Sequence, residues 1–324
     1  MKLVIQVPCL NEEKTLPLVF EKMPREIPGV DHIEYLVIDD GCTDGTVEVA
    51  RSLGVRHFVH HSRNMGLGQS FQDGALKALE MGADILVNTD GDNQYPSERI
   101  PDLVAPILHK MADVVVADRQ THSIEHFSPV KKKLQKIGSR VVNIAASTEL
   151  PDAASGFRAY SRESLIRLNL VTKFSYCMET IIQAGNKRMK ITSIPIDTNP
   201  KTRESRLFRS TSEHVLRSAA TILRAYVMYR PLSFFFWLGG LLFALGLIPF
   251  IRFLILTETG QGGVGRHLQS LLVGGVLILG SLITFSLGVI ADLIRINRVL
   301  IEDSLVHQKR MRFSSPEQET SVPV

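Results

Sequence analysis

The amino-acid sequence predicts an α/β domain followed by two transmembrane helices. Within residues 1–206, short apolar runs rich in β-branched residues alternate with helix-compatible segments, a pattern typical of a parallel sheet covered by helices. Two uncharged apolar runs follow, at 231–251 and 268–291. Each exceeds 20 residues, which is long enough for a helix to cross the hydrocarbon core of a bilayer.

The predicted sheet carries its polar residues at one edge. We expect strands at 2–7, 34–38, 55–59, 84–88 and 113–117, and helices at 12–24, 44–53, 69–81 and 98–110. In such sheets, ligands bind beyond the carboxyl ends of the strands. The polar residues that follow the first, second and fourth strands are Pro8, Asn11 and Glu12, then Asp39, Asp40 and Asp44, then Asp90 and Asp92.

The run ADILVNTDGDNQYP, residues 83–96, places two carboxylates directly after an apolar strand. Charged side chains at such a position need partners, and a hard divalent cation bound by Asp90 and Asp92 would supply one. Gln94 adds a third oxygen two residues further on. The alternative is an acidic turn that caps the strand, because Asp, Gly and Asn are ordinary turn residues.

Composition excludes several other classes of protein. The formal charge of +4 is modest, and the sequence contains no basic patch interleaved with aromatic residues. It therefore does not predict nucleic-acid binding. The three cysteines are widely spaced and form no CxxC pair, so neither a disulfide framework nor a zinc site is indicated and a reducing compartment fits. The glycine-rich stretch 63–74 lacks the spacing of a dinucleotide fingerprint. The first apolar run is too short for a signal peptide and predicts a strand.

The charges around the apolar runs predict their orientation. We expect membrane spans at 231–256 and 268–291, joined by an extracytoplasmic loop at 257–267. That loop carries only Arg266, whereas arginines and lysines precede the first span and follow the second. Cationic residues favour the cytoplasmic side, so we place the amino-terminal domain and the tail, 292–324, in the cytoplasm. Two spans per chain also allow packing into a homo-oligomer.

Two basic amphipathic segments are expected at the membrane surface. In residues 129–146, apolar side chains recur at helical spacing and lysines and arginines fill the other faces. A second such segment lies within the juxtamembrane stretch 207–230. Helices of this kind lie on anionic membrane surfaces, although an ordinary surface helix packed on the sheet is the alternative for 129–146.

Five motifs in order resemble the family 2 glycosyltransferases. They are PCLNEE at 8–13, IDDGCTDGT at 38–46, RNMGLG at 63–68, TDGDNQ at 89–94 and SGFRAYSRE at 155–163. With the two carboxy-terminal spans, the chain is similar to the polyprenyl-phosphate group of that family, which contains dolichol-phosphate mannose synthase and undecaprenyl-phosphate glucosyltransferases. The resemblance implies the GT-A (Rossmann-like) nucleotide-sugar-binding fold and inverting transfer of a hexose from a nucleotide diphosphate sugar to a polyprenyl phosphate at the cytoplasmic membrane face.

The resemblance also implies roles for individual residues. Those expected to bind the nucleotide sugar are Pro8, Asn11, Glu12, Asp40, Asp90 and Arg203. Those expected to hold Mg²⁺ or Mn²⁺ against the diphosphate are Asp90, Asp92 and Gln94. Those expected to act in catalysis are Asp92, Arg119 and Asp152, and for Asp152 either a general-base role or the positioning of the acceptor is open. Those expected to contact the acceptor phosphate are Lys133 and Ser139.

Some positions depart from the family pattern. Asn93 and Tyr95 differ from the residues that commonly follow the two aspartates, which leaves the sugar open. The later motif, at 203–206, lacks the usual glycine after Arg203. Two other functions are considered beside the leading one: transfer to a different membrane lipid such as diacylglycerol, and a catalytically silent membrane assembly partner that kept the fold.

Overall fold

The computed structural model describes residues 1–120, 129–170, 176–200, 220, 223–224, 226–258 and 268–313, with the backbone alone for 129–135. The chain divides into two compact units, Met1–Ile222 with Asp303–Val324, and Leu223–Glu302. The first holds the sheet and the second holds the long apolar helices, and each is described by itself. The predicted juxtamembrane segment 207–230 and the motif at 203–206 fall largely or wholly outside the described residues.

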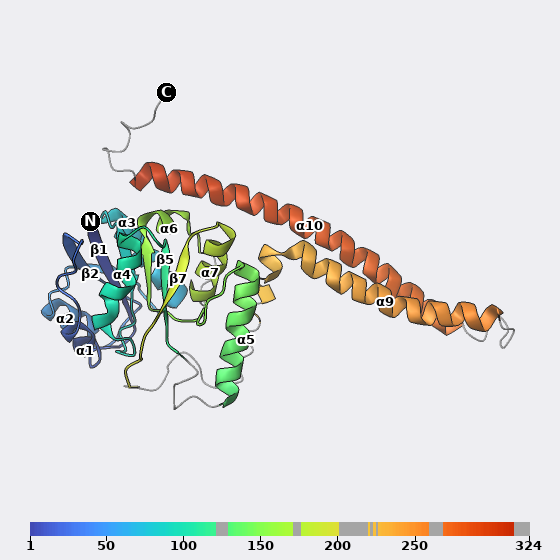
Figure 1. Ribbon diagram of the computed structural model, residues 1–324, viewed down its shortest axis with the longest axis horizontal. Coiled ribbons are helices and arrows are strands. Elements are labelled where there is room, and N and C mark those ends of the chain that lie inside the picture. Colours follow the sequence, from blue (N-terminus) through green and yellow to red (C-terminus); the bar gives the residue numbers. More distant parts are fainter. Residues whose placement is uncertain are drawn as a thin grey trace, which may run out of the picture. The chain divides into compact units, whose positions relative to one another are not determined.

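A seven-stranded sheet forms the centre of the first unit (Figure 1). Its order is β3-β2-β1-β4-β6-β5-β7. The strands are β1 (Lys2–Cys9), β2 (His32–Asp39), β3 (His57–His60), β4 (Ile85–Asn88), β5 (Val114–Asp118), β6 (Arg158–Ser161) and β7 (Ile191–Pro195). All five predicted strands are confirmed, and β1, β2, β4 and β5 carry the buried apolar runs from which they were predicted.

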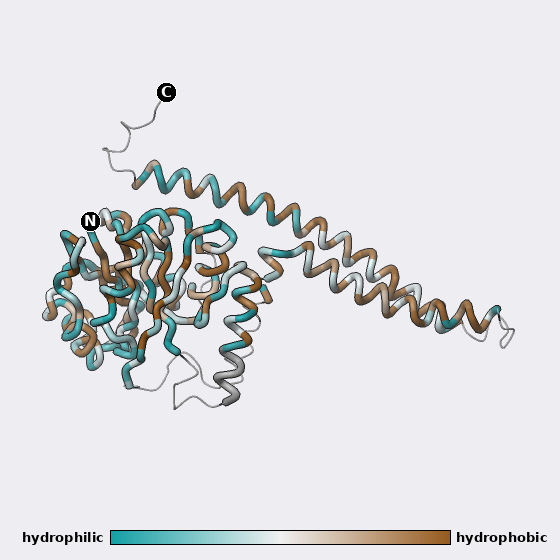
Figure 2. Tube along the Cα trace, viewed as in Figure 1, coloured by the Kyte–Doolittle hydropathy of each residue, from teal (hydrophilic) through white to brown (hydrophobic). Residues whose placement is uncertain are grey.

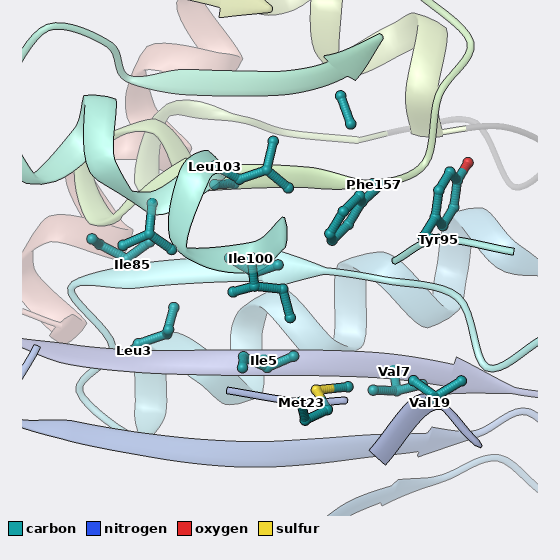
Figure 3. Packing of buried hydrophobic residues seen from close by; sticks show 14 of the residues in the cluster. Leu3, Ile5, Val7, Val19, Met23, Ile85, Tyr95, Ile100, Leu103 and Phe157 are labelled. Carbon is teal, nitrogen blue, oxygen red and sulfur yellow. The ribbon is translucent and has the colours of Figure 1, made fainter. Parts of the chain in front are cut away.

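Helices cover both faces of this sheet (Figure 1). They are α1 (Leu16–Glu21), α2 (Thr46–Ser52), α3 (Leu67–Glu80), the short η1 (Ser97–Arg99), α4 (Ile100–Leu108), α5 (Pro129–Ala146), α6 (Arg162–Arg167) and α7 (Tyr176–Asn186). Leu3, Ile5 and Val7 of β1 point to the face that α1 and α4 cover, where they join the main apolar core (Figure 3). Gln6 points to the opposite face, where α3 packs so closely that a Cβ on Gly74 would lie 2.3 Å from Gln6 Oε1.

The sheet is mixed rather than purely parallel, which corrects one expectation. β6 runs antiparallel to both of its neighbours, β4 and β5. The segment 152–157 before β6 already lies at the edge where β4 and β5 end, because Ala117 donates its N–H to the Phe157 carbonyl. The strand that follows it must therefore run back through the sheet. Neither β6 nor β7 was predicted, since β6 carries the buried Arg158 and β7 is only partly buried.

The second unit contains two candidate membrane spans, in helices α9 (Pro231–Glu258) and α10 (Leu268–Phe313). Only 11% and 22% of their most apolar windows are buried within the protein, whereas a core helix of a soluble protein would be mostly buried. Figure 2 shows hydrophobic residues along most of α9 and along the amino-terminal part of α10. Glycines bring the two helices close together: a Cβ on Gly246 would lie 3.1 Å from the Gly274 carbonyl oxygen. Small residues serve this purpose in membrane helix pairs.

Helix α10 continues past the predicted end of its span at residue 291, and from Asp303 onward it belongs to the first unit. Lys309 Nζ donates to the Leu168 carbonyl at 2.7 Å, and Arg312 contacts Glu80 at 2.8 Å. Phe313 is 8% exposed, and its carbonyl accepts from Arg162. Burial lowers the pKa of Lys309 to about 8. The tail 292–324 is thus helical as far as residue 313.

Replacing Lys309 by Met tests this packing. The pKa of Lys309 is lower in the folded state than its usual 10.5, so wild-type stability rises with pH between about 8 and about 10.5. A methionine has no charge to desolvate. We expect the variant to unfold at a higher temperature than the wild type near about pH 7, and this difference to shrink toward about pH 10.

Thermal unfolding in detergent across this pH range provides the measurement. The same substitution at the exposed Lys190 is the control for the loss of one positive charge at the surface. If the difference for Lys309→Met did not change with pH, the packing of Lys309 on the Leu168 carbonyl would be contradicted.

Candidate active site

The predicted polar residues gather at one edge of the sheet, which we call the rim. β1 is parallel to β2 and β4, and β5 runs in the same direction as β4 because β6 between them is antiparallel to both, so the carboxyl ends of these four strands lie at this edge. The segments that follow these strands, together with 152–157 before β6, form the rim: residues 10–13, 40–46, 89–95, 119–120 and 152–157. This location is where α/β sheets place their ligands.

The acidic turn after β4 holds Asp90, Asp92 and Gln94, all partly exposed. Asp92 Oδ1 accepts the Gln94 backbone N–H at 3.1 Å, and Asp92 Oδ2 accepts from Gln94 Nε2 at 2.8 Å. Gln94 therefore orients the Asp92 carboxylate through its amide group. Asn93 between them has a φ of 59°, in the left-handed region that Asn tolerates better than most residues.

Tyr95 joins this turn to the segment before β6. Its ring is 5% exposed and stacks on Phe157 with centroids 5.2 Å apart, and its hydroxyl accepts the Gly156 N–H at 3.0 Å (Figure 3). Burial raises the pKa of Tyr95, so the hydroxyl stays neutral. The residue that departs from the common family pattern is thus part of the support beneath the acidic turn.

The acidic turn has the chemistry of a site for a divalent cation. Carboxylate and amide oxygens are ligands that Mg²⁺ and Mn²⁺ accept. The segment before β6 lies against Asp90, because a Cβ on Gly156 would be in ordinary contact with Asp90 Oδ2, at 3.5 Å. Among the residues that the structure describes, no three His, Cys, Asp or Glu side chains are grouped to hold a metal. A cation here would therefore need further oxygens from a bound ligand, as Mg²⁺ on phosphates commonly does.

The segments after β1 and β2 are fastened to each other. Asn11 Oδ1 accepts the Thr43 N–H at 2.7 Å, and the Glu12 N–H donates to Thr46 Oγ1 at 2.8 Å. Glu12 is 4% exposed, and its carboxylate accepts from the Thr15 hydroxyl at 2.7 Å. Beside them, a Cβ on Gly91 would lie 3.5 Å from the Pro8 carbonyl oxygen, so Pro8 adjoins the acidic turn.

Asp40 is buried in a network that sequence reasoning missed. Its Oδ1 accepts the Met65 N–H at 2.8 Å and its Oδ2 accepts the Gly66 N–H at 3.0 Å, which ties down the RNMGLG segment. His61 lies between two carboxylates, with Nδ1 2.7 Å from Asp40 and Nε2 3.1 Å from Asp73. These bonds hold the RNMGLG segment in place, and the predicted contact of Asp40 with the nucleotide remains a prediction.

Arg119 and Asp152 form a buried bidentate ion pair. Arg119 Nε lies 2.6 Å from Asp152 Oδ2 and Nη2 lies 3.0 Å from Oδ1, and the Asp152 side chain is 1% exposed. Burial alone would raise the pKa of Asp152, but the Arg119 guanidinium outweighs it and holds that pKa below its usual value. A carboxylate with a lowered pKa and both oxygens engaged is a weak base. Of the two roles expected for Asp152, the geometry favours positioning.

The remaining predicted residues lie in different environments. Ser139 is 6% exposed, and its Oγ accepts the Ala153 N–H at 3.3 Å, so it adjoins the segment that carries Asp152. The side chain of Lys133 and the whole of Arg203 lie outside the described residues. The acceptor contacts of Lys133 and Ser139 and the donor contact of Arg203 stay predictions.

Gly156 is the residue beneath the site that sequence reasoning did not single out. Its carbonyl accepts from Asn88 Nδ2 at 2.9 Å and from the Tyr176 hydroxyl at 2.9 Å, while its N–H donates to Tyr95. Asn88 is fully buried within β4 and also accepts from Gln6 Nε2 at 2.8 Å. A polar residue inside the apolar strand 85–88 was the available signal.

Replacing Asp152 by Asn tests the buried ion pair. Asn keeps the size of the side chain but leaves the Arg119 charge without its counter-charge. Breaking a buried pair this way costs about 3 kcal/mol or more of unfolding free energy. Chemical denaturation in detergent measures it. The control is Asp102→Asn, which breaks an exposed pair with Arg99 and should cost about 1 kcal/mol or less. If Asp152→Asn lost activity at wild-type stability, a direct chemical role for Asp152 would be favoured instead.

Comparisons with known proteins agree with this geometry. Among proteins of similar sequence is the UDP-N-acetylglucosamine–dolichyl-phosphate N-acetylglucosaminyltransferase of Methanococcus voltae, 27% identical over 59% of this chain and 83% of the relative. Another is the undecaprenyl-phosphate mannosyltransferase of Micrococcus luteus, 27% identical over 60% of this chain and 83% of the relative. A third is the polyprenol monophosphomannose synthase of Mycolicibacterium smegmatis, 27% identical over 60% of this chain and 76% of the relative.

A solved structure shares the fold. Glucosyl-3-phosphoglycerate synthase from Mycobacterium tuberculosis, crystallised with Mn²⁺, UDP and glucosyl-3-phosphoglycerate, aligns with a TM-score of 0.52 at 20% identity, over 70% of this chain and 78% of that one. The sheet is therefore the GT-A fold that the motifs predicted. The model of the family named "Glycosyl transferase family 2" matches residues 4–168, where the rim residues lie. The chain belongs to glycosyl transferase family 2 and is a glycosyltransferase.

Proposed function

We propose that this glycosyltransferase moves a hexose from a nucleoside diphosphate sugar to a polyprenyl phosphate at the cytoplasmic face of the membrane, with inversion and with help from Mg²⁺ or Mn²⁺. The acidic turn Asp90–Asp92 carries the proposal, because it offers hard oxygen ligands at the same rim as the partly buried Arg119. The relatives' named activities on dolichyl and undecaprenyl phosphates support the lipid acceptor.

The hydrogen-bonded segments that follow β1 and β2 would form the part of the site that binds the nucleotide-sugar donor. Pro8, Asn11 and Glu12 would line the nucleoside pocket beside the acidic turn. The segment held by Asp40 and His61 would close its other side. The positive charge of Arg119, held in place by Asp152, would attract the phosphate groups, as would Arg203 further along the chain.

The chemistry is a single displacement. A phosphate oxygen of the acceptor forms a bond to the anomeric carbon while the bond from that carbon to the donor's diphosphate oxygen breaks, and the nucleoside diphosphate leaves from the opposite face. A divalent cation, when bound, supplies positive charge for the oxygens of the leaving group. The acceptor phosphate is already anionic near neutral pH, so orientation contributes more than proton removal. This agrees with an Asp152 that positions Arg119.

The acceptor end would lie near helix α5. On its described part, one face is buried, with Ser139 and Val142 against the protein, and the other presents Ile137 and Ile144, 50% and 52% exposed, with Arg140 between them. A hollow of about 410 Å³ lies beside them, lined by Arg140, Asn143, Ile144 and residues 148–151. Exposed apolar side chains flanked by cations suit an anionic lipid surface. The flanking arginines of the two spans support the cytoplasmic side.

A donor panel with Asp92→Asn tests the transfer. Membranes containing the wild type should move label from one of GDP-mannose, UDP-glucose, UDP-galactose or a UDP-N-acetylhexosamine into polyprenyl phosphate, and EDTA should abolish this. Asp92→Asn should lower kcat by about a hundredfold or more, because it removes a charge that acts on the leaving group. Full activity of Asp92→Asn would favour the silent assembly partner.

The product identifies the acceptor lipid. A glycosyl polyprenyl phosphate is cleaved by mild acid at the anomeric phosphate ester, so extracted label should be acid-labile. Label in an acid-stable lipid would overturn the polyprenyl acceptor and favour diacylglycerol or another membrane lipid, with the donor site unaffected.

Replacing Ile137 and Ile144 by Asp together tests the membrane face of α5. Loss of two apolar contacts and the added negative charge should lower activity on polyprenyl phosphate in anionic vesicles by about tenfold. Activity on a short-chain, water-soluble prenyl phosphate should be unchanged. The matched control is Met111→Asp, an apolar residue 63% exposed outside α5, which should leave both activities intact. Equal loss on both acceptors would contradict a role of this face in lipid docking.

A further inference from the structure

The chain leaving β7 reaches the acidic turn from the far edge of the sheet. β7 is the edge strand beyond β5, whereas the acidic turn follows β4, and two strands, β6 and β5, stand between them. Ile196 is 1% exposed and its N–H donates to the Asp118 carbonyl at 2.9 Å, so the segment starts at the rim beside the end of β5. Three residues later it arrives at the acidic turn.

Asn199 makes that contact through both its backbone and its side chain. Its backbone N–H donates to the Gln94 carbonyl at 3.0 Å. Its Nδ2 donates to the Asn93 carbonyl at 3.0 Å and lies 3.4 Å from Asn93 Oδ1. Two consecutive carbonyls of the acidic turn are therefore held by one residue from a distant strand.

These hydrogen bonds hold the residue of the acidic turn whose backbone conformation is unusual. Asn93 is in the left-handed conformation, which costs a residue with a side chain about 1 kcal/mol and persists only where its surroundings hold it. Asp92 and Gln94 flank it, and the Asp92 carboxylate takes its direction from Gln94. Fixing the carbonyls of 93 and 94 thus fixes the direction of the carboxylate at 92.

We propose that Asn199 is a positioning residue for the donor diphosphate: by holding the carbonyls of Asn93 and Gln94, it sets the direction of the Asp92 carboxylate. This inference rests on the proposed function, since it assigns the acidic turn to a metal-bound diphosphate. The inference concerns only the binding of the donor diphosphate and is independent of which lipid is the acceptor.

Three variants separate this role from a general structural one. Asn199→Ala removes the side-chain bonds, and Asn199→Asp keeps the shape but puts an acceptor oxygen against the Asn93 carbonyl. Asn93→Gly is the matched control, because glycine keeps the carbonyl that Asn199 uses and adopts the left-handed conformation without strain. The probe is Mn²⁺, titrated with the solubilised full chain in the presence of UDP and, separately, of GDP, with free Mn²⁺ measured by electron paramagnetic resonance.

We expect wild type and Asn93→Gly to bind Mn²⁺ alike in the presence of one of the two diphosphates. Asn199→Ala and Asn199→Asp should bind it about tenfold more weakly, a difference of about 1.4 kcal/mol, with the thermal unfolding midpoint unchanged. In turnover assays their KM for the nucleotide sugar should rise while the KM for the lipid acceptor stays constant.

Two results would overturn the role of Asn199: wild-type Mn²⁺ binding by both of its variants, or an equal loss in Asn93→Gly. A wild type that binds Mn²⁺ no better with UDP or GDP than without would instead overturn the proposed metal-bound diphosphate, and the role of Asn199 with it.

Discussion

The hydrogen bonds at Gly156 are the interaction on which the rest of the rim depends. Its N–H is held by Tyr95 from the acidic turn, and its carbonyl is held by Asn88 from the strand beneath and by Tyr176 from α7. This residue therefore joins the acidic turn, β4 and α7 beside the Asp90 carboxylate. A Cβ at 156 would lie 3.2 Å from the Tyr176 hydroxyl, so a larger residue would crowd one of these hydrogen-bond partners.

The strands that are buried over most of their length could be predicted from the sequence. The apolar runs of β1, β2, β4 and β5 and the carboxylates that follow them were recognisable because strand burial leaves a local pattern. β6 was not, because its first residue is Arg158, a fully buried guanidinium whose bonds go to neutral acceptors such as the Cys177 carbonyl at 2.7 Å. The antiparallel direction of β6 and the reach of Asn199 depend on contacts between distant residues, which no local pattern encodes.

In the second span as well, the local sequence predicts one part of the structure, and contacts between distant residues determine another part. Hydropathy identified where α10 is apolar, but the helix continues for another 22 residues beyond 291. Ion pairs one turn apart, Asp292 with Arg295 and Arg298 with Glu302, each at 2.8 Å, suit a helix that has left the apolar environment. Its last described turn packs through Lys309 and Phe313, and the sequence alone does not reveal these contacts.

The main effect of pairing Arg119 with Asp152 is to hold a positive charge in a fixed position, and its contribution to the stability of the fold matters less. A buried ion pair often stabilises a fold no better than apolar residues of the same size. Its effect here is that a guanidinium 19% exposed keeps one fixed orientation at the rim. Charge held in place before a ligand arrives requires no reorganisation during reaction, and in a partly buried site it acts more strongly than in water. A rim that must bind anionic groups repeatedly gains from such an arrangement even where the fold does not.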